Sequence, residues 1–226
     1  MNRENGLLIT IDGPAGAGKT TVSRNLAARL GYTYVDTGAL YRGVALAAVR
    51  SGVEPDDDQG LARLCGGLNI GFSQQGGQSR LQVNGEDVTD LIRTPEISMA
   101  ASAVSARPVV RSFLLDVQRD LGSRRAAVFE GRDMGSVVFP DADVKFFLSA
   151  ALKTRALRRY QELGAAAASL DQVEKDMARR DGNDTNRALA PLAPAPDAVR
   201  IDSTDLSADA VVEKMMEVIG STRGEN

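Results

Sequence analysis

Apolar stretches with two different periods alternate over the first fifty residues. Leu7 to Ile11 form an apolar run, which predicts a strand. Thr20 to Leu30 carry apolar residues at helical spacing, and Gly31 is a typical residue after a helix C-terminus. Tyr32 to Val35 predict a second short strand, and Ala39 to Val49 a second helix. This alternation predicts an α/β fold with a parallel sheet.

The alternation is interrupted between Leu68 and Asp90. Ile70 to Phe72 and Leu81 to Val83 are short alternating segments, and the second is followed by Asn84-Gly85, a strong hairpin signal. We therefore expect a small antiparallel insertion on the parallel core. The acidic segment Glu54 to Asp58 that precedes it is interpreted as a solvated surface loop.

Helices and buried strands alternate again after the insertion. Thr94-Pro95-Glu96 begins a helix that extends to about Ser105, and Pro108 begins another that extends to about Leu121. Ala126 to Glu130 and Val144 to Leu148 are two further apolar strands of the kind buried in parallel sheets. Both are expected to belong to the core.

The last third of the chain is rich in arginine. Leu152 to about Arg187 reads as helical, with arginine pairs on either side of a turn at Gly164 to Ser169. Two interpretations stay open: a salt-bridged surface, or a hinged lid over phosphate groups. Ala198 to Asp202 predict a last strand, and Ser207 is the expected N-cap of a final amphipathic helix.

The segment Gly13-Pro14-Ala15-Gly16-Ala17-Gly18-Lys19-Thr20 fits the phosphate-binding P-loop pattern, with a predicted strand before it and a helix after it. Its glycines permit backbone conformations in which successive N–H groups point at a polyanion. Lys19 can reach the outer phosphates of a nucleoside triphosphate, and the Thr20 hydroxyl can bind Mg²⁺. The expected nucleotide-binding residues are Gly13, Pro14, Ala15, Gly16, Ala17, Gly18, Lys19, Thr20 and Thr21.

Composition narrows the classes of function. The 226 residues are 43% hydrophobic and 25% charged, which is typical of a folded globular chain. A formal net charge of −3 argues against a general nucleic-acid binder. One cysteine cannot form an intramolecular disulfide, and no apolar stretch approaches the roughly 18 residues that span a membrane. We expect a cytoplasmic protein with no membrane anchor.

The chain contains no histidine, which excludes histidine-based acid–base catalysis and histidine metal ligands. Other polar residues follow predicted strands: Asp36 after one, and Arg132 and Asp133 after another. Ligands of open parallel sheets bind beyond the carboxyl ends of the strands, so these three residues should gather near the P-loop. The simpler alternative for Asp133 is a structural cap, and for the lid arginines it is solvation at the surface.

Several motifs together resemble the bacterial cytidylate kinases, a branch of the nucleoside monophosphate kinase family. Beyond the P-loop, the resemblance rests on Asp36 to Arg42, Ile92 to Glu96, Gly131 to Gly135 with Val138-Phe139-Pro140, and Arg180-Asp181 leading to Asp184, Asn186 and Arg187. It covers nearly the whole chain. It implies Mg²⁺-dependent transfer of the γ-phosphoryl group of ATP to CMP or dCMP by a monomer. The net charge and the lack of a long apolar stretch already lead us to expect no nucleic-acid or membrane partner.

The resemblance also implies a three-layer P-loop core with a five-stranded parallel sheet, a small substrate-binding insert and an arginine-rich helical lid. The core would comprise residues 1–66, 106–151 and 188–226, the insert 67–105 and the lid 152–187.

Residue roles carried over from the family fall into four groups. Tyr41, Arg42 and Arg132 would contact the acceptor phosphate. The cytosine contacts would be Thr37, Ser102, Arg111 and Asp133. Arg180 and Asp184 would contact the pentose, while Arg158 and Arg187 would be the lid cations that reach the transferring phosphoryl group. Lys19, Arg132, Arg158 and Arg187 are thus the expected catalytic residues.

Two other functions are weighed against this one. A P-loop GTPase switch requires an Asn-Lys-x-Asp guanine site, which the sequence lacks, and Asp36-Thr37-Gly38-Ala39 does not have the spacing of an Asp-x-x-Gly switch. A kinase for another small acceptor, such as UMP or shikimate, is the nearer alternative.

Overall fold

The fold was determined as a computed structural model that describes residues 6–75, 78–164 and 169–224. The described chain forms two compact units. One contains the described residues of Met1–Tyr34 and Arg124–Asn226, and the other is Val35–Ser123. The second unit contains the predicted insert, residues 67–105, together with the helices that flank it. The division into core, insert and lid by role remains a prediction.

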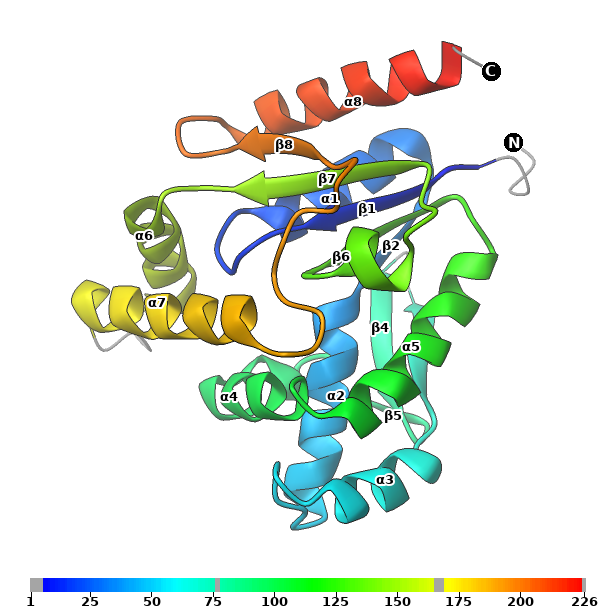
Figure 1. The fold of residues 1–226 in the computed structure, drawn as a ribbon, viewed down its shortest axis with the longest axis vertical. Helices are drawn as coiled ribbons and strands as arrows, with labels where there is room; N and C mark the ends of the chain where they lie inside the picture. Colours follow the sequence, from blue (N-terminus) through cyan, green and yellow to red (C-terminus); the bar gives the residue numbers. More distant parts are fainter. Residues whose placement is uncertain (1–5, 76–77, 165–168, 225–226) are drawn as a thin grey trace. The chain divides into compact units, whose positions relative to one another are not determined.

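A five-stranded sheet of order β2-β6-β1-β7-β8 organises the first unit (Figure 1). Its strands are β1 (Leu8–Asp12), β2 (Thr33–Asp36), β6 (Ala127–Gly131), β7 (Val144–Ser149) and β8 (Val199–Asp202). β1 pairs in parallel with both β6 and β7, and β7 pairs in parallel with β8. The predicted α/β class with a five-stranded parallel sheet is confirmed.

The strand predicted from the apolar run is the central strand β1, and it is buried along its whole length. In the register of the sheet, Asp12 lies opposite Gly131 of β6 and Phe147 of β7. The residues that follow these three positions therefore leave the sheet at the same edge, beyond the carboxyl ends of parallel strands. These residues include the P-loop and Arg132-Asp133.

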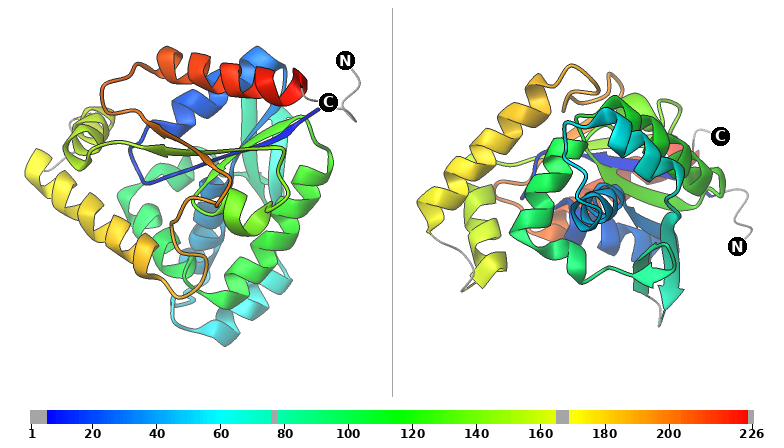
Figure 2. Two further views of the ribbon diagram at one scale, coloured as in Figure 1. Left: turned by 45° about the horizontal axis from the view of Figure 1, so that its top comes forward. Right: turned by 90° about the horizontal axis from the view of Figure 1, so that it is seen from below.

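Two helices of this unit, α1 (Lys19–Leu30) and α8 (Ala208–Gly224), lie side by side (Figures 1 and 2). Leu26, Val212 and Met215 belong to one apolar cluster with the inner residues of β1 and β7. The amide of Ala210 donates a hydrogen bond to Ser207 Oγ at 3.2 Å, so the predicted cap of the last helix is confirmed.

The arginine-rich segment forms two packed helices, α6 (Leu152–Leu163) and α7 (Leu170–Asn186). Residues 165–168 of the predicted lid turn lie outside the described residues. After α7 the chain returns to β8, and Lys145 Nζ holds this connector by an ion pair of 2.7 Å with Asp197. None of the described helices is long and apolar enough to cross a membrane.

The second unit contains α2 (Thr37–Arg50), α4 (Pro95–Val104) and α5 (Pro108–Ser123), with a short 3₁₀ turn at Leu91–Arg93. Its three-stranded sheet comprises β3 (Ile70–Gln75), β4 (Gln78–Val83) and β5 (Glu86–Asp87), all antiparallel. Asn84 and Gly85 have positive φ angles of 51° and 82°, which confirms the tight turn that their pairing predicts.

One helix of this unit was not expected. The predicted acidic surface loop gives way at Asp58 to α3 (Asp58–Gly66), whose N-cap Asp57 accepts a hydrogen bond from the Gly60 amide at 2.8 Å. Leu61 and Cys65 are buried one helical turn apart and pack into the core of the unit. Glu54 to Asp57 thus form the predicted surface loop, and the helix that follows them was not predicted.

Candidate active site

The P-loop turns sharply at the end of β1. Gly13 has a φ of 147°, and a Cβ at this position would lie 2.0 Å from the carbonyl oxygen of Leu148. Gly18, the residue before α1, has a φ of 88° and is left-handed. Only glycine fits both positions without strain. The loop therefore has the geometry that its sequence pattern predicts.

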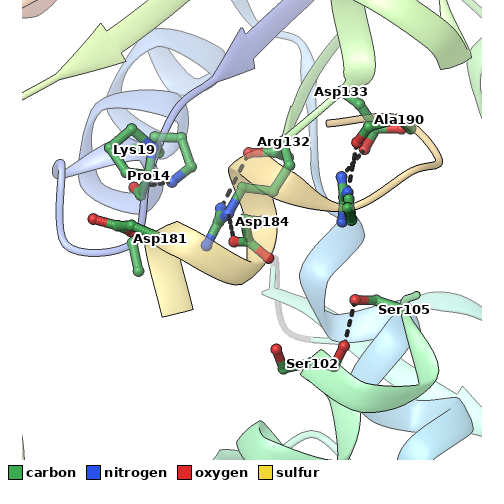
Figure 3. Close-up of polar contacts among 12 residues, drawn as sticks. Pro14, Lys19, Ser102, Ser105, Arg132, Asp133, Asp181, Asp184 and Ala190 are labelled. Carbon is green, nitrogen blue, oxygen red and sulfur yellow. Dashed lines mark hydrogen bonds and ion pairs between the residues drawn. The ribbon is translucent and has the colours of Figure 1, made fainter. Parts of the chain in front are cut away.

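Lys19 lies at the start of α1 and folds back over the loop, where its Nζ donates a hydrogen bond to the Pro14 carbonyl at 2.8 Å (Figure 3). The side chain is buried. Burial lowers the pKa of Lys19, the positive charge of Arg132 lowers it further, and Glu130 and Asp12 oppose the shift. Burial of the Lys19 ammonium beside the P-loop is therefore unfavourable, and an anionic ligand bound there would offset this desolvation cost.

Thr20 and Glu130 are joined across this edge of the sheet. The Thr20 hydroxyl donates to Glu130 Oε1 at 2.9 Å, and Glu130 is the penultimate residue of β6. A hydroxyl and a carboxylate are oxygen ligands of the kind that Mg²⁺ prefers, and this ion is usually held by one or two protein groups together with water and substrate phosphates. Within the described residues, no group of three or more acidic, histidine or cysteine side chains could hold a metal ion. The donor set fits a metal that is delivered with a nucleotide.

Asp12, the last residue of β1, is buried and accepts hydrogen bonds from the amides of Met134 and Gly135, both at 2.8 Å. These amides belong to a π-helical turn, Met134–Val138, which follows Arg132 and Asp133 directly. The carboxylate thus fixes the turn that carries two predicted substrate residues to the end of the P-loop strand. Burial raises the pKa of Asp12 to about 6, although the two backbone hydrogen bonds act in the opposite direction.

We expect Asp12→Asn to change how stability depends on pH. Because the folded protein holds the Asp12 proton above the ordinary pKa of 3.8, the unfolded chain ionises first as the pH rises. The wild type should therefore lose unfolding free energy relative to the variant between pH 4 and 6.5, by up to roughly 3 kcal/mol. Urea denaturation of both proteins at the two pH values measures this difference in unfolding free energy. The other titrating groups are the same in both proteins, so their contributions cancel. A difference that does not change with pH would contradict the raised pKa.

Two ion pairs organise the residues after β6. Arg132 Nε donates to Asp184 Oδ2 of α7 at 3.1 Å, and the dashed lines of Figure 3 mark this contact. Arg187 contacts Asp133 at 3.4 Å and donates to the Ala190 carbonyl at 2.5 Å. The side chain of Arg187 is only 9% exposed, so solvation at the surface does not explain it. Four predicted site residues are therefore brought together in pairs.

The remaining residues predicted for the lid divide between α6 and α7. Arg158 donates from Nη2 to the Ser203 carbonyl at 2.7 Å and from Nη1 to the Ser203 hydroxyl at 3.2 Å. Arg180 is half-buried and lies close enough to Lys19 to influence its pKa. The buried arginine of α6 is Arg155, which forms an ion pair of 2.7 Å with Asp181.

The predicted acceptor residues of the second unit lie at the start of α2, on α4 and on α5. Arg42 forms an ion pair of 2.8 Å with Asp36, and Thr37 is buried. The Arg111 guanidinium carbon lies 5.8 Å from the centre of the Tyr41 ring, a cation–π arrangement.

Arg111 Nη1 also donates to the Ser105 carbonyl at 3.3 Å. Ser102 is half-buried, and its carbonyl accepts from the Ser105 hydroxyl (Figure 3). Ser102 and Arg111 are thus linked through Ser105.

Sequence reasoning assigned no role to five residues that contact the predicted site or its immediate neighbours: Asp12, Glu130, Arg155, Asp181 and Ser203. A signal existed for Glu130, since it is an acidic residue at the end of an otherwise apolar strand. Ser203 carried none, because its contact with the P-loop joins residues 186 positions apart.

Comparison with known proteins places the chain among nucleotide kinases. The family model described as cytidylate kinase matches residues 9–221. The chain is 54% identical to "Cytidylate kinase" of Geobacter sulfurreducens, over 95% of this chain and 93% of that protein. It is 45% identical to "Cytidylate kinase" of Pasteurella multocida, over 95% of this chain and 96% of that protein. Among solved structures, shikimate kinase from Bacteroides thetaiotaomicron has the same fold, with a TM-score of 0.51 at 12% identity, covering 94% and 97% of the two chains.

Proposed function

Because the chain belongs to the cytidylate kinase family, we propose that it transfers the γ-phosphoryl group of ATP to CMP and dCMP, giving CDP and dCDP. The observation that carries the proposal is the pairing of β1 with β6, which sets Asp12 opposite Gly131. This register brings a phosphate cradle and the Arg132-Asp133 turn to one edge of the sheet.

The chemistry suits a chain without histidine. Phosphoryl transfer has a loose transition state with charge spread over the equatorial oxygens, so catalysis depends mainly on positioning and on positive charge. The second pKa of a phosphate monoester is about 6, so the phosphate of CMP is already an anionic nucleophile at neutral pH. No general base is needed.

We assign the P-loop amides and Lys19 to the phosphates of ATP, and Thr20 with Glu130 to Mg²⁺. Bound there, Mg²⁺ would neutralise charge on the β- and γ-phosphates. Arg132 would hold the acceptor phosphate, and Arg158 and Arg187 would approach the transferring group from the lid. In the described structure these arginines have carboxylate or carbonyl partners, which anionic substrates would replace.

Tyr41 and Arg42 are assigned to the acceptor phosphate, and Arg180 and Asp184 to the pentose. Thr37, Ser102, Arg111 and Asp133 are assigned to cytosine. An ionised carboxylate only accepts hydrogen bonds, so Asp133 suits the N4 amine of cytosine. We also propose that the protein is a monomer and works in the cytoplasm.

A panel of acceptors tests the proposal. Purified protein is incubated with ATP, Mg²⁺ and one of CMP, dCMP, UMP or shikimate, and ADP formation is measured. We expect rapid ADP formation with CMP and dCMP that requires Mg²⁺. Faster turnover of UMP or shikimate than of CMP would contradict the assignment and favour the alternative acceptor.

Both lid helices should become more protected when the donor and acceptor sites are filled together. Closure would exclude water and bring arginines to the transferring group. Hydrogen–deuterium exchange with and without a bisubstrate inhibitor measures this, and α8 serves as the internal reference. Unchanged exchange in α6 and α7 at saturating inhibitor would show that this segment is not a lid.

A further inference from the structure

The outer side of the P-loop is held by hydrogen bonds that its sequence motif does not include. The Pro14 carbonyl accepts from the motif's own Lys19 Nζ at 2.8 Å, but two other loop carbonyls accept from side chains outside the motif: Ala15 from Arg155 Nη1 at 3.1 Å, and Ala17 from Ser203 Oγ at 3.0 Å. Arg155 belongs to α6, and Ser203 follows β8. Both elements are remote from the loop in sequence.

Holding a carbonyl also orients an amide. The C=O of one residue and the N–H of the next belong to the same planar trans peptide and point in opposite directions. The Ala17 carbonyl therefore determines the direction of the Gly18 N–H, and the Ala15 carbonyl that of the Gly16 N–H. Gly16 and Gly18 both have positive φ, at 73° and 88°. Because glycine adopts many backbone conformations easily, these two peptide planes have little intrinsic preference for one orientation.

The surroundings of Ser203 direct its hydroxyl proton toward the loop. Ser203 is 3% exposed, and its amide donates to the Ser149 carbonyl at 2.8 Å. Arg158 can only donate, so it occupies a lone pair of the Ser203 hydroxyl and leaves the proton for a carbonyl. The two carbonyls within reach are those of Ala17 at 3.0 Å and Ser149 at 3.1 Å, and the Ser149 carbonyl already accepts from the Ser203 amide, which favours Ala17 as the acceptor.

The second anchor, Arg155, is fixed independently. Its Nε donates to the Ala150 carbonyl at 2.9 Å, and its guanidinium is paired with Asp181 at 2.7 Å. The side chain is only 8% exposed. A planar guanidinium fixed at these points presents its remaining N–H groups in a set direction, toward the Ala15 carbonyl.

We infer that Ser203 and Arg155 are positioning residues that hold the Ala17 and Ala15 carbonyls outward, so that the Gly18 and Gly16 amides face the donor phosphates. This inference rests on the proposed phosphate-binding role of the loop. Neither residue needs to touch the nucleotide. Their effect should therefore fall on the binding of polyphosphate and not on the acceptor.

Removal of the Ser203 hydroxyl tests the inference. Inorganic tripolyphosphate with Mg²⁺ probes the cradle without adenine, and ATP probes it with adenine, both by isothermal titration calorimetry. We expect Ser203→Ala to weaken both ligands by the same factor, about 3- to 10-fold, which is the size of one hydrogen bond. The KM for CMP should stay at its wild-type value.

Ser23→Ala is the matched control. Ser23 is fully buried in α1 next to the loop, and its hydroxyl has no hydrogen-bond partner within the described structure. It should bind both ligands as the wild type does. The inference would be overturned if the two variants lost affinity for these ligands equally, or if Ser203→Ala kept the wild-type affinity. If Ser203→Ala bound ATP more weakly but tripolyphosphate with unchanged affinity, Ser203 would act on the adenosine part of ATP. That result would also overturn the inference.

An effect through Arg158 can be separated from an effect on the loop. In an Arg158→Met background, Ser203→Ala should still weaken the binding of tripolyphosphate. The Ser203 hydroxyl accepts from Arg158 but donates to the Ala17 carbonyl, so the contact with the loop does not require Arg158. If the loss disappears in that background, Ser203 acts through Arg158 and the inference is wrong. Failure of the proposed function is distinguishable, since wild-type protein that lacks CMP kinase activity could still bind tripolyphosphate in a Ser203-dependent manner.

The Arg155 anchor has its own variant. Arg155→Lys keeps a positive charge beside Asp181 but cannot donate to three partners in the same plane. We expect weaker tripolyphosphate binding, with thermal unfolding measured in parallel to verify the fold. If Arg155→Lys bound tripolyphosphate with wild-type affinity, Arg155 would not be a positioning residue of the loop.

Discussion

Lys19→Met is expected to fold and to lose about 100- to 1,000-fold in kcat, the usual effect of removing one well-placed electrostatic group from a transition state. The Lys19 ammonium lies 2.8 Å from the Pro14 carbonyl, at the mouth of the cradle in which the phosphates of ATP would lie. Methionine is of similar length but carries no charge. Steady-state measurement of ADP formation with CMP gives the result directly.

Stability should not account for that loss. Because burial lowers the pKa of Lys19 in the folded protein, its positive charge opposes folding at pH values below its ordinary pKa of 10.5. The variant should therefore be at least as stable as the wild type at pH 7, as measured by urea denaturation.

Lys145→Met is the matched control for this substitution. Lys145 has the same exposed fraction as Lys19, 7%, and its partner Asp197 is exposed, so no buried charge is left without a partner. The turnover of Lys145→Met should remain close to that of the wild type. Near-normal turnover of Lys19→Met would remove Lys19 from the catalytic residues.

Local patterns accounted for the elements whose signals lie within a few residues. The continuous apolar run before the P-loop predicted β1, and Asn84-Gly85 predicted the turn between β4 and β5. α3 was missed although Leu61 and Cys65 are spaced as on a helix, because the preceding acidic residues were interpreted as a loop. Residues 54–57 do form a loop, but Asp57 also signalled the helix after it, since an aspartate before a helix is a typical N-cap.

The candidate site divides in the same way. The P-loop could be predicted because its chemistry is contained in eight consecutive residues. Glu130 and Asp12 could have been predicted as charged residues at the ends of apolar strands, but their partners depend on strand order, which the sequence does not specify. Ser203 and Arg155 act through contacts with Ala17 and Ala15 that only the folded chain reveals. Residues that support a loop from outside have no motif of their own.

Base choice should depend on Arg111. Cytosine presents an acceptor at N3, whereas uracil presents a donor there. A guanidinium only donates, so Arg111 suits cytosine and would face a like group in uracil. Arg111 already donates to the Ser105 carbonyl and lies over the Tyr41 ring, which holds the side chain in a defined place in the second unit.

Arg111→Met should therefore reduce kcat/KM for CMP by roughly 10- to 150-fold, the range for a hydrogen bond to a charged group, and should reduce kcat/KM for UMP much less. The preference for CMP over UMP narrows as a result. Arg107→Met is the control, because Arg107 is four residues earlier and is paired at 2.6 Å with Asp58. It should leave the preference unchanged. If Arg111→Met lowers kcat/KM for CMP and for UMP by the same factor, Arg111 serves the fold or the phosphate and does not read the base.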